Sequence, residues 1–302
     1  MINRLFLMTT MLMVYCISTY AQGCSDAGIC TISSFKPGSL NYSDSMHTSV
    51  KVGINTGSAD HNISVLATYV EYERSVSSNL DINARLTSLS QSGNGISVWG
   101  LSDIYLTVKF RVWDQLSLIL GAKLPLTDGN RLHNQLPLPM DYQSSLGTVD
   151  GIAGLGYKMG SLQLMAGYQH PVIQNDNKYE RRLYEEGNIL GTFQSTSKYT
   201  RNSDILFRAS YTVPLVGKLT ITPSVLAVYH TDNDTWQSGP DKVHIINGSK
   251  GMTLNGNLYV DFPFLMRHAV QASVGFPLAV RDVRPDGLTR GFVAGIEYKY
   301  TF

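Results

Sequence analysis

Charged and amide side chains recur at every second position along several segments of the sequence. Asp81, Asn83 and Arg85 show this spacing in one segment, and Lys109 and Arg111 show it in another. Because successive side chains of a β-strand point to opposite faces, a period of two gathers these groups in a row on one face. A row of mixed charges can contact a solute along its length, so the pattern favours a solute path over a single reaction centre.

The histidines and glycines lack the spacing of known catalytic or cofactor sites. Gly154-Leu155-Gly156 with Gly160 lacks the helix that a nucleotide-binding loop requires. His170 falls near one rim on the outer face, where a lipid hydrolase could use it, yet no Gly-x-Ser-x-Gly elbow accompanies it. We therefore predict no enzyme activity, no metal and no cofactor. The seven histidines without metal or triad spacing are His47, His61, His133, His170, His230, His244 and His268.

The composition excludes several classes of protein. Of the 302 residues 43% are hydrophobic and 16% are charged, which is too polar for a bundle of membrane helices and too apolar for a disordered chain. The 24 basic and 23 acidic residues nearly cancel. This balance removes the electrostatic footprint of nucleic-acid binding, so no nucleic-acid partner is expected.

The N-terminus has the pattern of a secretory signal peptide. Arg4 precedes an apolar stretch from Leu5 to about Ile17, and Thr19-Tyr20-Ala21 offers small residues for cleavage before Gln22. The apolar stretch is shorter than the roughly 20 residues that a membrane-spanning helix needs. Residues 1–21 are therefore predicted to direct export and then to be removed.

Two cysteines remain after this cleavage, Cys24 and Cys30. Exported compartments are oxidising, so a small disulfide between them is expected. A zinc site would need further ligands close by, and the nearest histidine is His47.

Apolar and polar residues alternate through most of the remaining chain, which predicts strands of about ten residues. In the second segment Glu71 and Glu73 fall on the face that begins as apolar at Ile63, so we predict a bulge there. The predicted strands are 48–57, 62–73, 79–89, 101–112, 115–125, 149–159, 161–171, 203–214, 217–230, 251–263, 266–280 and 289–302.

The connections between these segments alternate in length, which is typical of outer-membrane β-barrels with short periplasmic turns and long external loops. The tight connections are 74–78, 113–114, 160, 215–216 and 263–266. Those predicted to be long are 90–100, 126–148, 172–202, 231–250 and 281–288, and the one near 58–61 is short. We therefore predict an all-β fold, a closed antiparallel transmembrane barrel of about twelve strands over residues 48–302, in a Gram-negative outer membrane.

A barrel in lipid must turn its apolar face outward and can keep a polar lumen. Residues 22–47 are then expected either to lie in the periplasm or to plug this lumen. The residues predicted to line the lumen are Asp81, Arg85, Asp103, Lys109, Arg111, Lys123, Asp150, Lys158, Arg208, His230, Asp261, Glu297 and Lys299.

The last strand ends with aromatic residues at every second position, Tyr298, Tyr300 and Phe302. This resembles the C-terminal signal that the outer-membrane assembly machinery recognises. The expected partners are therefore this machinery, periplasmic chaperones and outer-membrane lipids.

Residues from about 95 to 302 resemble a family of exported barrels, the transporter-like family of the meta-pathway of phenol degradation. The resemblance rests on Gly100-Leu101-Ser102-Asp103-Ile104 before Leu106 and Lys109-Phe110, on Gly121-Ala122-Lys123-Leu124-Pro125, on Leu146-Gly147-Thr148-Val149-Asp150, and on Phe276-Pro277-Leu278. Ser102 stands where the family pattern has a glycine. The resemblance implies passage of small compounds, hydrophobic or aromatic ones included.

Three functions are compatible with this sequence. The leading one is a channel or transporter for small solutes. The first alternative is a structural or surface-binding barrel that acts through its long external loops, and the second is a lipid hydrolase that uses a rim histidine.

Overall fold

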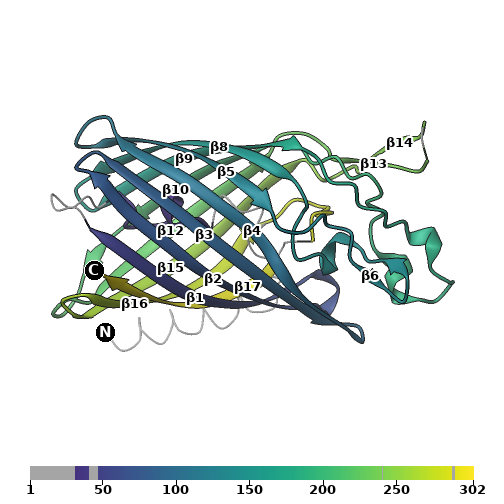
Figure 1. The fold of residues 1–302 in the computed structure, drawn as a ribbon, viewed down its shortest axis with the longest axis horizontal. Coiled ribbons are helices and arrows are strands. Elements are labelled where there is room, and N and C mark those ends of the chain that lie inside the picture. Colours follow the sequence, from purple (N-terminus) through teal and green to yellow (C-terminus); the bar gives the residue numbers. More distant parts are fainter. Residues whose placement is uncertain (1–30, 41–46, 240, 288–289) are drawn as a thin grey trace, which may run out of the picture.

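A computed structural model describes residues 31–40, 47–239, 241–287 and 290–302. The predicted signal peptide and the predicted disulfide between Cys24 and Cys30 lie outside these residues. Within them, twelve long antiparallel strands form one sheet that closes on itself, because β1 pairs with β17 and β10 pairs with both β9 and β12 (Figure 1). The predicted barrel is confirmed. Its strands are β1 (Thr48–Ala59), β2 (Ser64–Ser77), β3 (Leu80–Gly93), β4 (Ile96–Arg111), β5 (Leu116–Pro125), β8 (Val149–Met159), β9 (Leu162–Ile173), β10 (Asp204–Tyr211), β12 (Thr220–His230), β15 (Gly251–Leu265), β16 (His268–Ala279) and β17 (Arg290–Thr301).

The other elements are short and lie mostly in the connections. Within the described ranges, no helix is long and apolar enough to cross a membrane. The short strands are β6 (Leu132–His133), β7 (Leu136–Pro137), β11 (Val213–Pro214), β13 (Thr235–Gln237) and β14 (Val243–Ile245). The 3-10 turns are η2 (Ser33–Phe35), η3 (Asp60–Asn62), η4 (Met140–Tyr142), η5 (Arg181–Leu183) and η6 (Ile189–Thr192).

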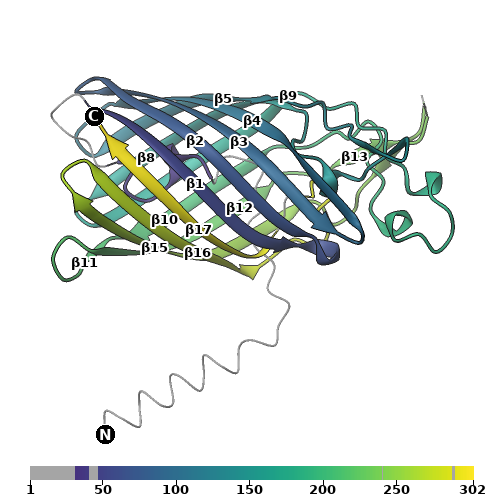
Figure 2. The ribbon, with the colours of Figure 1, turned by 60° about the horizontal axis from the view of Figure 1, so that its bottom comes forward.

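Long connections gather at one end of the barrel, and tight turns and the C-terminus lie at the other (Figure 2). One predicted long connection, residues 90–100, is wrong. There β3 runs on to Gly93, β4 already begins at Ile96, and the turn consists of Asn94 and Gly95 alone. Both turn residues have positive φ, 52° and 76°, as a two-residue hairpin turn of type I′ requires.

The outer face of the barrel is apolar. Leu120 is 51% exposed and Phe207 is 50% exposed, although both lie in the middle of strands. Exposed aromatic side chains gather toward both ends of the outer face, as in barrels whose aromatic girdles lie at the two membrane interfaces. They include Trp99, Tyr168, Tyr229 and Phe292 toward the long-loop end, and Trp113, Tyr157, Tyr211, Phe264 and Phe302 toward the short-turn end.

The bulge predicted before Glu71 in the second strand is absent, and the register of β2 against β3 shifts only later, between Ser75 and Ser77. β2 alternates without interruption from Val65 to Tyr72 and pairs with β1 in one register. Glu71 is fully buried and Glu73 shares its side, so both acids turn inward with Tyr69. Alternation of apolar and polar residues does not identify the faces of this strand, because its inner face changes from apolar to charged along its length.

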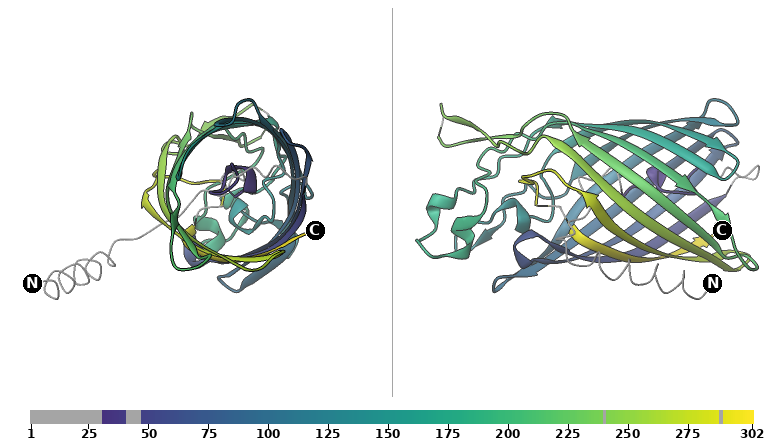
Figure 3. Two further views of the ribbon diagram at one scale, coloured as in Figure 1. Left: turned by 90° about the vertical axis from the view of Figure 1, so that its left-hand side faces the viewer. Right: turned by 180° about the vertical axis from the view of Figure 1, so that it is seen from behind.

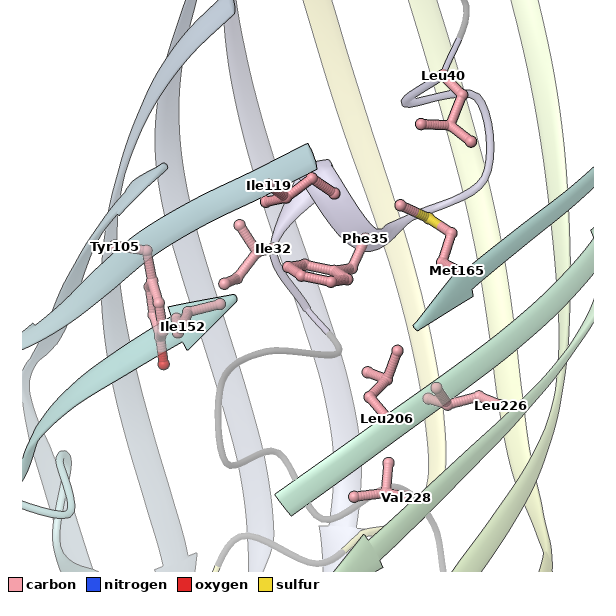
Figure 4. Close-up of a cluster of buried hydrophobic side chains, with 10 residues drawn as sticks. All are labelled: Ile32, Phe35, Leu40, Tyr105, Ile119, Ile152, Met165, Leu206, Leu226 and Val228. Carbon is pink, nitrogen blue, oxygen red and sulfur yellow. The ribbon is translucent and has the colours of Figure 1, made fainter. Parts of the chain in front are cut away.

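Residues 31–40 lie inside the barrel (Figure 3, left). Ile32, Phe35 and Leu40 from this segment form an apolar cluster with inward side chains of the wall (Figure 4). The wall contributes Tyr105, Ile119, Ile152, Met165, Leu206, Leu226 and Val228.

The connections at the long-loop end form a second apolar cluster with the ends of β2, β3 and β4. Tyr142 of η4 donates a hydrogen bond to the carbonyl of Gly93 at 2.9 Å, and Tyr179 and Phe193 of the 174–203 connection are buried beside it. These connections are therefore packed against the barrel mouth.

Candidate functional site

The lumen is the candidate site, and strand parity places every residue predicted to line it on the inner face. Eight are buried: Asp81, Arg85, Asp103, Lys109, Lys123, Asp150, Arg208 and His230. Arg111, Lys158, Asp261, Glu297 and Lys299 are partly exposed there.

Opposite charges pair along the wall formed by β1 to β4. Glu71 lies 3.1 Å from Lys51 and 3.4 Å from Arg85, and Asp81 lies 3.0 Å from Lys109. Lys51 and Glu71 belong to this cluster although neither is among the residues predicted to line the lumen. Such buried pairs are stable only when both partners are present.

A second charged layer lies near the long-loop end. Lys123 lies 2.9 Å from Asp150 and donates a hydrogen bond to Thr148 at 2.7 Å. Farther round the barrel, the His230 ring bridges Asp204 and Asp234, at 2.7 Å from each. His230 is thus enclosed by carboxylates inside the barrel.

This layer continues into the connections. Arg281 lies 2.5 Å from Asp286, and Arg201 approaches the same carboxylate and also binds Asp204. Burial opposes ionisation of Asp286, but the charges of Arg281 and Arg201 outweigh it and lower the pKa of that carboxyl. Ion pairs therefore tie three connections to the barrel mouth.

Polar contacts hold residues 31–40 across the lumen. Arg85 donates a hydrogen bond to the carbonyl of Thr31 at 2.6 Å, and Arg208 donates one to the carbonyl of Phe35 at 2.7 Å. β3 and β10, which carry these arginines, are separated by four strands (β4, β5, β8, β9) on one side and six on the other. The segment is therefore anchored to opposite walls. Its further contacts are Ser34 with Thr107, Lys36 with Glu297, Gly38 with Gln163 and Ser39 with Lys109.

Two glycines of β8 make room for this segment. A Cβ on Gly154 would lie 2.5 Å from the Phe35 ring, and one on Gly156 would lie 2.6 Å from the Leu40 side chain. The glycine pattern 154–156 is thus explained by close packing inside the barrel.

Cavities lie on either side of residues 31–40. The larger one, about 390 Å³, lies toward the short-turn end and is bordered by Lys51, Lys109 and Lys299 together with Glu73 and Asp261. A smaller one, about 80 Å³, lies between the segment and the wall formed by β15 to β17. The lumen therefore holds polar spaces interrupted by the N-terminal segment.

The rim histidine has a partner that the sequence did not reveal. His170 Nδ1 lies 2.7 Å from Ser203 Oγ, which also accepts a hydrogen bond from Tyr168 at 3.0 Å. In the part of the chain that the structure describes, no carboxylate orients the His170 ring, and no group of His, Cys, Asp and Glu is arranged for a metal. The contact therefore lacks the third group of a hydrolytic triad.

The C-terminal aromatic residues lie on the outer face of β17. Tyr298 and Phe302 are exposed, and the Tyr298 hydroxyl lies 2.6 Å from His268. Their recognition by assembly machinery stays a prediction.

One solved structure has a related fold. The COG4313 outer membrane channel from Pseudomonas putida F1 aligns with a TM-score of 0.58 and 13% identity, over 88% of this chain and 99% of that one. The chain is an outer-membrane β-barrel. In barrels of this fold, tight turns face the periplasm and long connections lie outside the cell, and we expect the same orientation here.

Other comparisons give weaker likeness. The KdgM porin aligns with a TM-score of 0.45 and 7% identity, over 84% of this chain and 99% of that one. No family model and no curated protein matches the sequence. The likeness to the COG4313 channel supports the barrel fold, while the phenol-degradation label has no further support.

Proposed function

We propose that this barrel is a channel for small solutes and that residues 31–40 keep it closed in the state described here. The observation that carries the proposal is the anchoring of this segment to opposite walls by Arg85 and Arg208. Both arginines donate to main-chain carbonyls, so they fix the backbone of residues 31–40 across the lumen. These contacts do not depend on the side chains of the segment.

The segment can move without dismantling the barrel. It contributes no strand to the sheet, and the barrel is closed by pairing of β1 with β17. Its anchors are hydrogen bonds, an ion pair and three apolar side chains, each worth about 1–3 kcal/mol. Displacing it would join the two polar cavities into one path.

The charged inner wall favours the passage of polar solutes in particular. Its charges are mixed and paired, as with Lys51 and Glu71, so the lumen presents both signs to a solute. Passage of small solutes follows from this wall, and strong selection between cations and anions does not.

Conductance of the mature chain in planar bilayers tests the proposal. Ser34 Oγ and Thr107 Oγ1 lie 2.8 Å apart, so Ser34→Cys with Thr107→Cys can lock the segment to β4. Cys24 and Cys30 are replaced by serine in every protein used. We expect conductance to be low in the oxidised protein and to rise at least several-fold on reduction.

Removing residues 22–40 should give the same open state without any reagent. The matched control is the Ser34→Cys single variant, whose conductance should not respond to reductant. A barrel that stays electrically silent and impermeable after both the reduction and the deletion would rule out the channel.

A further inference from the structure

The smaller cavity, between residues 31–40 and the wall, has a lining of unusual composition. Its charged side chains are Lys36, Arg85 and Arg208, and no carboxylate of the described residues lines it. The acidic partners of two of these cations lie outside the lining, Glu71 at 3.4 Å from Arg85 and Glu297 at 3.5 Å from Lys36. The cavity is therefore positive on its polar side.

Asparagine amides complete the polar side. Asn55, Asn255 and Asn257 all line the cavity. Asn255 is only 1% exposed, yet neither its Nδ2 nor its Oδ1 has a hydrogen-bond partner in the protein, and Asn257 Nδ2 also has none. A buried amide without partners costs about 1–3 kcal/mol, so these groups are suited to a ligand that supplies the missing bonds.

Two glycines make space for these amides. A Cβ on Gly275 would lie 2.7 Å from Asn257 Oδ1, and one on Gly295 would lie 2.0 Å from Asn55 Oδ1. Any other residue at either position would push an asparagine out of place. The amides are therefore fitted into the wall.

The rest of the lining combines apolar side chains with the hydroxyl-bearing Thr31, Tyr259 and Ser273. Leu226 and Val293 border the cavity beside the asparagines. At about 10–15 Å³ for each water-sized group, a volume of about 80 Å³ holds about five to eight such groups. The ligand that fits has a compact anionic head and a short apolar body.

We propose that this cavity binds a small organic anion, a monocarboxylate of about six non-hydrogen atoms, on its way through the lumen. Its carboxylate meets the positive side formed by Arg85, Arg208 and Lys36, and the Asn255 amide donates to it. This site rests on the proposed channel function for its role, but its occupancy can be measured without transport.

Calorimetric titration of the full mature protein in detergent tests the site, with butyrate as the probe and butyramide as its uncharged counterpart of the same shape. Charge-assisted hydrogen bonds are about twice as strong as neutral ones, so we expect butyrate to bind at least about tenfold more tightly. Equal binding of the two compounds, or no binding of either, would overturn the proposal and leave a pocket for water only.

Variants locate the binding. Asn255→Asp keeps the shape but adds an anion to the lining, so it should weaken butyrate binding at least about tenfold. Asn255→Leu should weaken it several-fold. Asn79→Asp adds the same charge at an exposed periplasmic turn and should leave it unchanged.

The two proposals can fail separately. Unchanged butyrate binding in Asn255→Asp, with a barrel that still migrates as folded before boiling, would overturn the site. Silent bilayers from the deletion variant with intact butyrate binding would overturn the channel and keep the site.

Discussion

At the scale of single residues, the lumen depends on pairs whose members come from different strands. Lys123 of β5 and Asp150 of β8 are both at most 1% exposed and lie 2.9 Å apart. Neither side chain is exposed to solvent that could replace a lost partner. Pairs of this kind fix the interior more by the cost of breaking them than by their net attraction.

Replacing Lys123 should therefore destabilise the barrel strongly. We expect Lys123→Met to lower the free energy of unfolding by about 3–5 kcal/mol, because Asp150 is left buried and unpaired. Lys250→Met is the control, because Lys250 and Asp232 lie 3.9 Å apart and are both exposed. This substitution should change the free energy of unfolding by at most about 1 kcal/mol. Urea unfolding in lipid vesicles measures both. Equal effects of the two substitutions would contradict this account.

Gly156 tests the packing of residues 31–40 inside the barrel. Gly156→Val should displace Leu40 and raise conductance, since the three atoms nearest to an added Cβ all belong to the Leu40 side chain. Adding Leu40→Ala should restore the low conductance. Gly151→Val on the outer face of the same strand is the control, because its Cβ meets only an ordinary contact at 3.8 Å. Similar currents from all three variants would show that Leu40 does not close the lumen.

At the scale of elements, η4 joins the 126–148 connection to the barrel mouth. Gly287 approaches the backbone of Asp141 so closely that a Cβ there would lie 2.5 Å away. Burial, together with the charges of Asp60 and Asp286, raises the pKa of Asp141 to about 7, while Arg284 opposes the shift. The protonated carboxyl is thus the form suited to the packed state.

The packing of η4 should therefore weaken as the pH rises. Between the ordinary pKa near 4 and about 7, the folded state holds a proton that the unfolded state has lost, so stability falls across this window and is constant above it. The protection factors of the amides in residues 126–148, which correct the exchange rates for the pH dependence of intrinsic exchange, should be lower at pH 8 than at pH 5.

Asp141→Asn isolates this carboxyl. Burial lowers the pKa of the neighbouring His61, which acts in the opposite direction below about pH 6.5. The Asp141→Asn variant should lose the additional protection from exchange at low pH that protonated Asp141 provides. It should keep only the loss of protection at low pH that results from protonation of His61. Parallel pH profiles for the variant and the natural protein would refute the role of Asp141.

At the scale of the whole molecule, the barrel places apolar side chains on its lipid-facing exterior and polar side chains in its interior, the reverse of a soluble globular protein. Leu120 lies on the outer face in the middle of β5, whereas Gln271 lies on the inner face of β16 beside Asp261. The same charge should therefore have opposite consequences at the two positions.

Arginine scanning measures this difference. Leu120→Arg should cost about 2–4 kcal/mol of stability in vesicles, as for charges at the bilayer midplane. Gln271→Arg should cost about 1 kcal/mol or less, because it remains in the polar lumen beside a carboxylate. A similar cost at both positions would contradict the assignment of the faces.

The sequence alone determined the twelve-stranded barrel, because alternation with a period of two and the parity of connection lengths are local properties. It failed where two local signals competed. The 90–100 region was interpreted as a loop, although Asn94-Gly95 is a strong hairpin signal. A bulge was predicted in the second strand because Val65 and Tyr69 share a face with Glu71, yet this whole face turns inward without a bulge.

The tertiary structure alone decided what fills the barrel. Alternation fixes the face on which a side chain lies, but not which residue meets it across the lumen. Arg208 and Phe35 are 173 positions apart, and Lys36 and Glu297 are 261 apart. Only closure of the sheet brings such pairs within hydrogen-bond distance, because it sets the curvature and width of the lumen into which residues 31–40 fit.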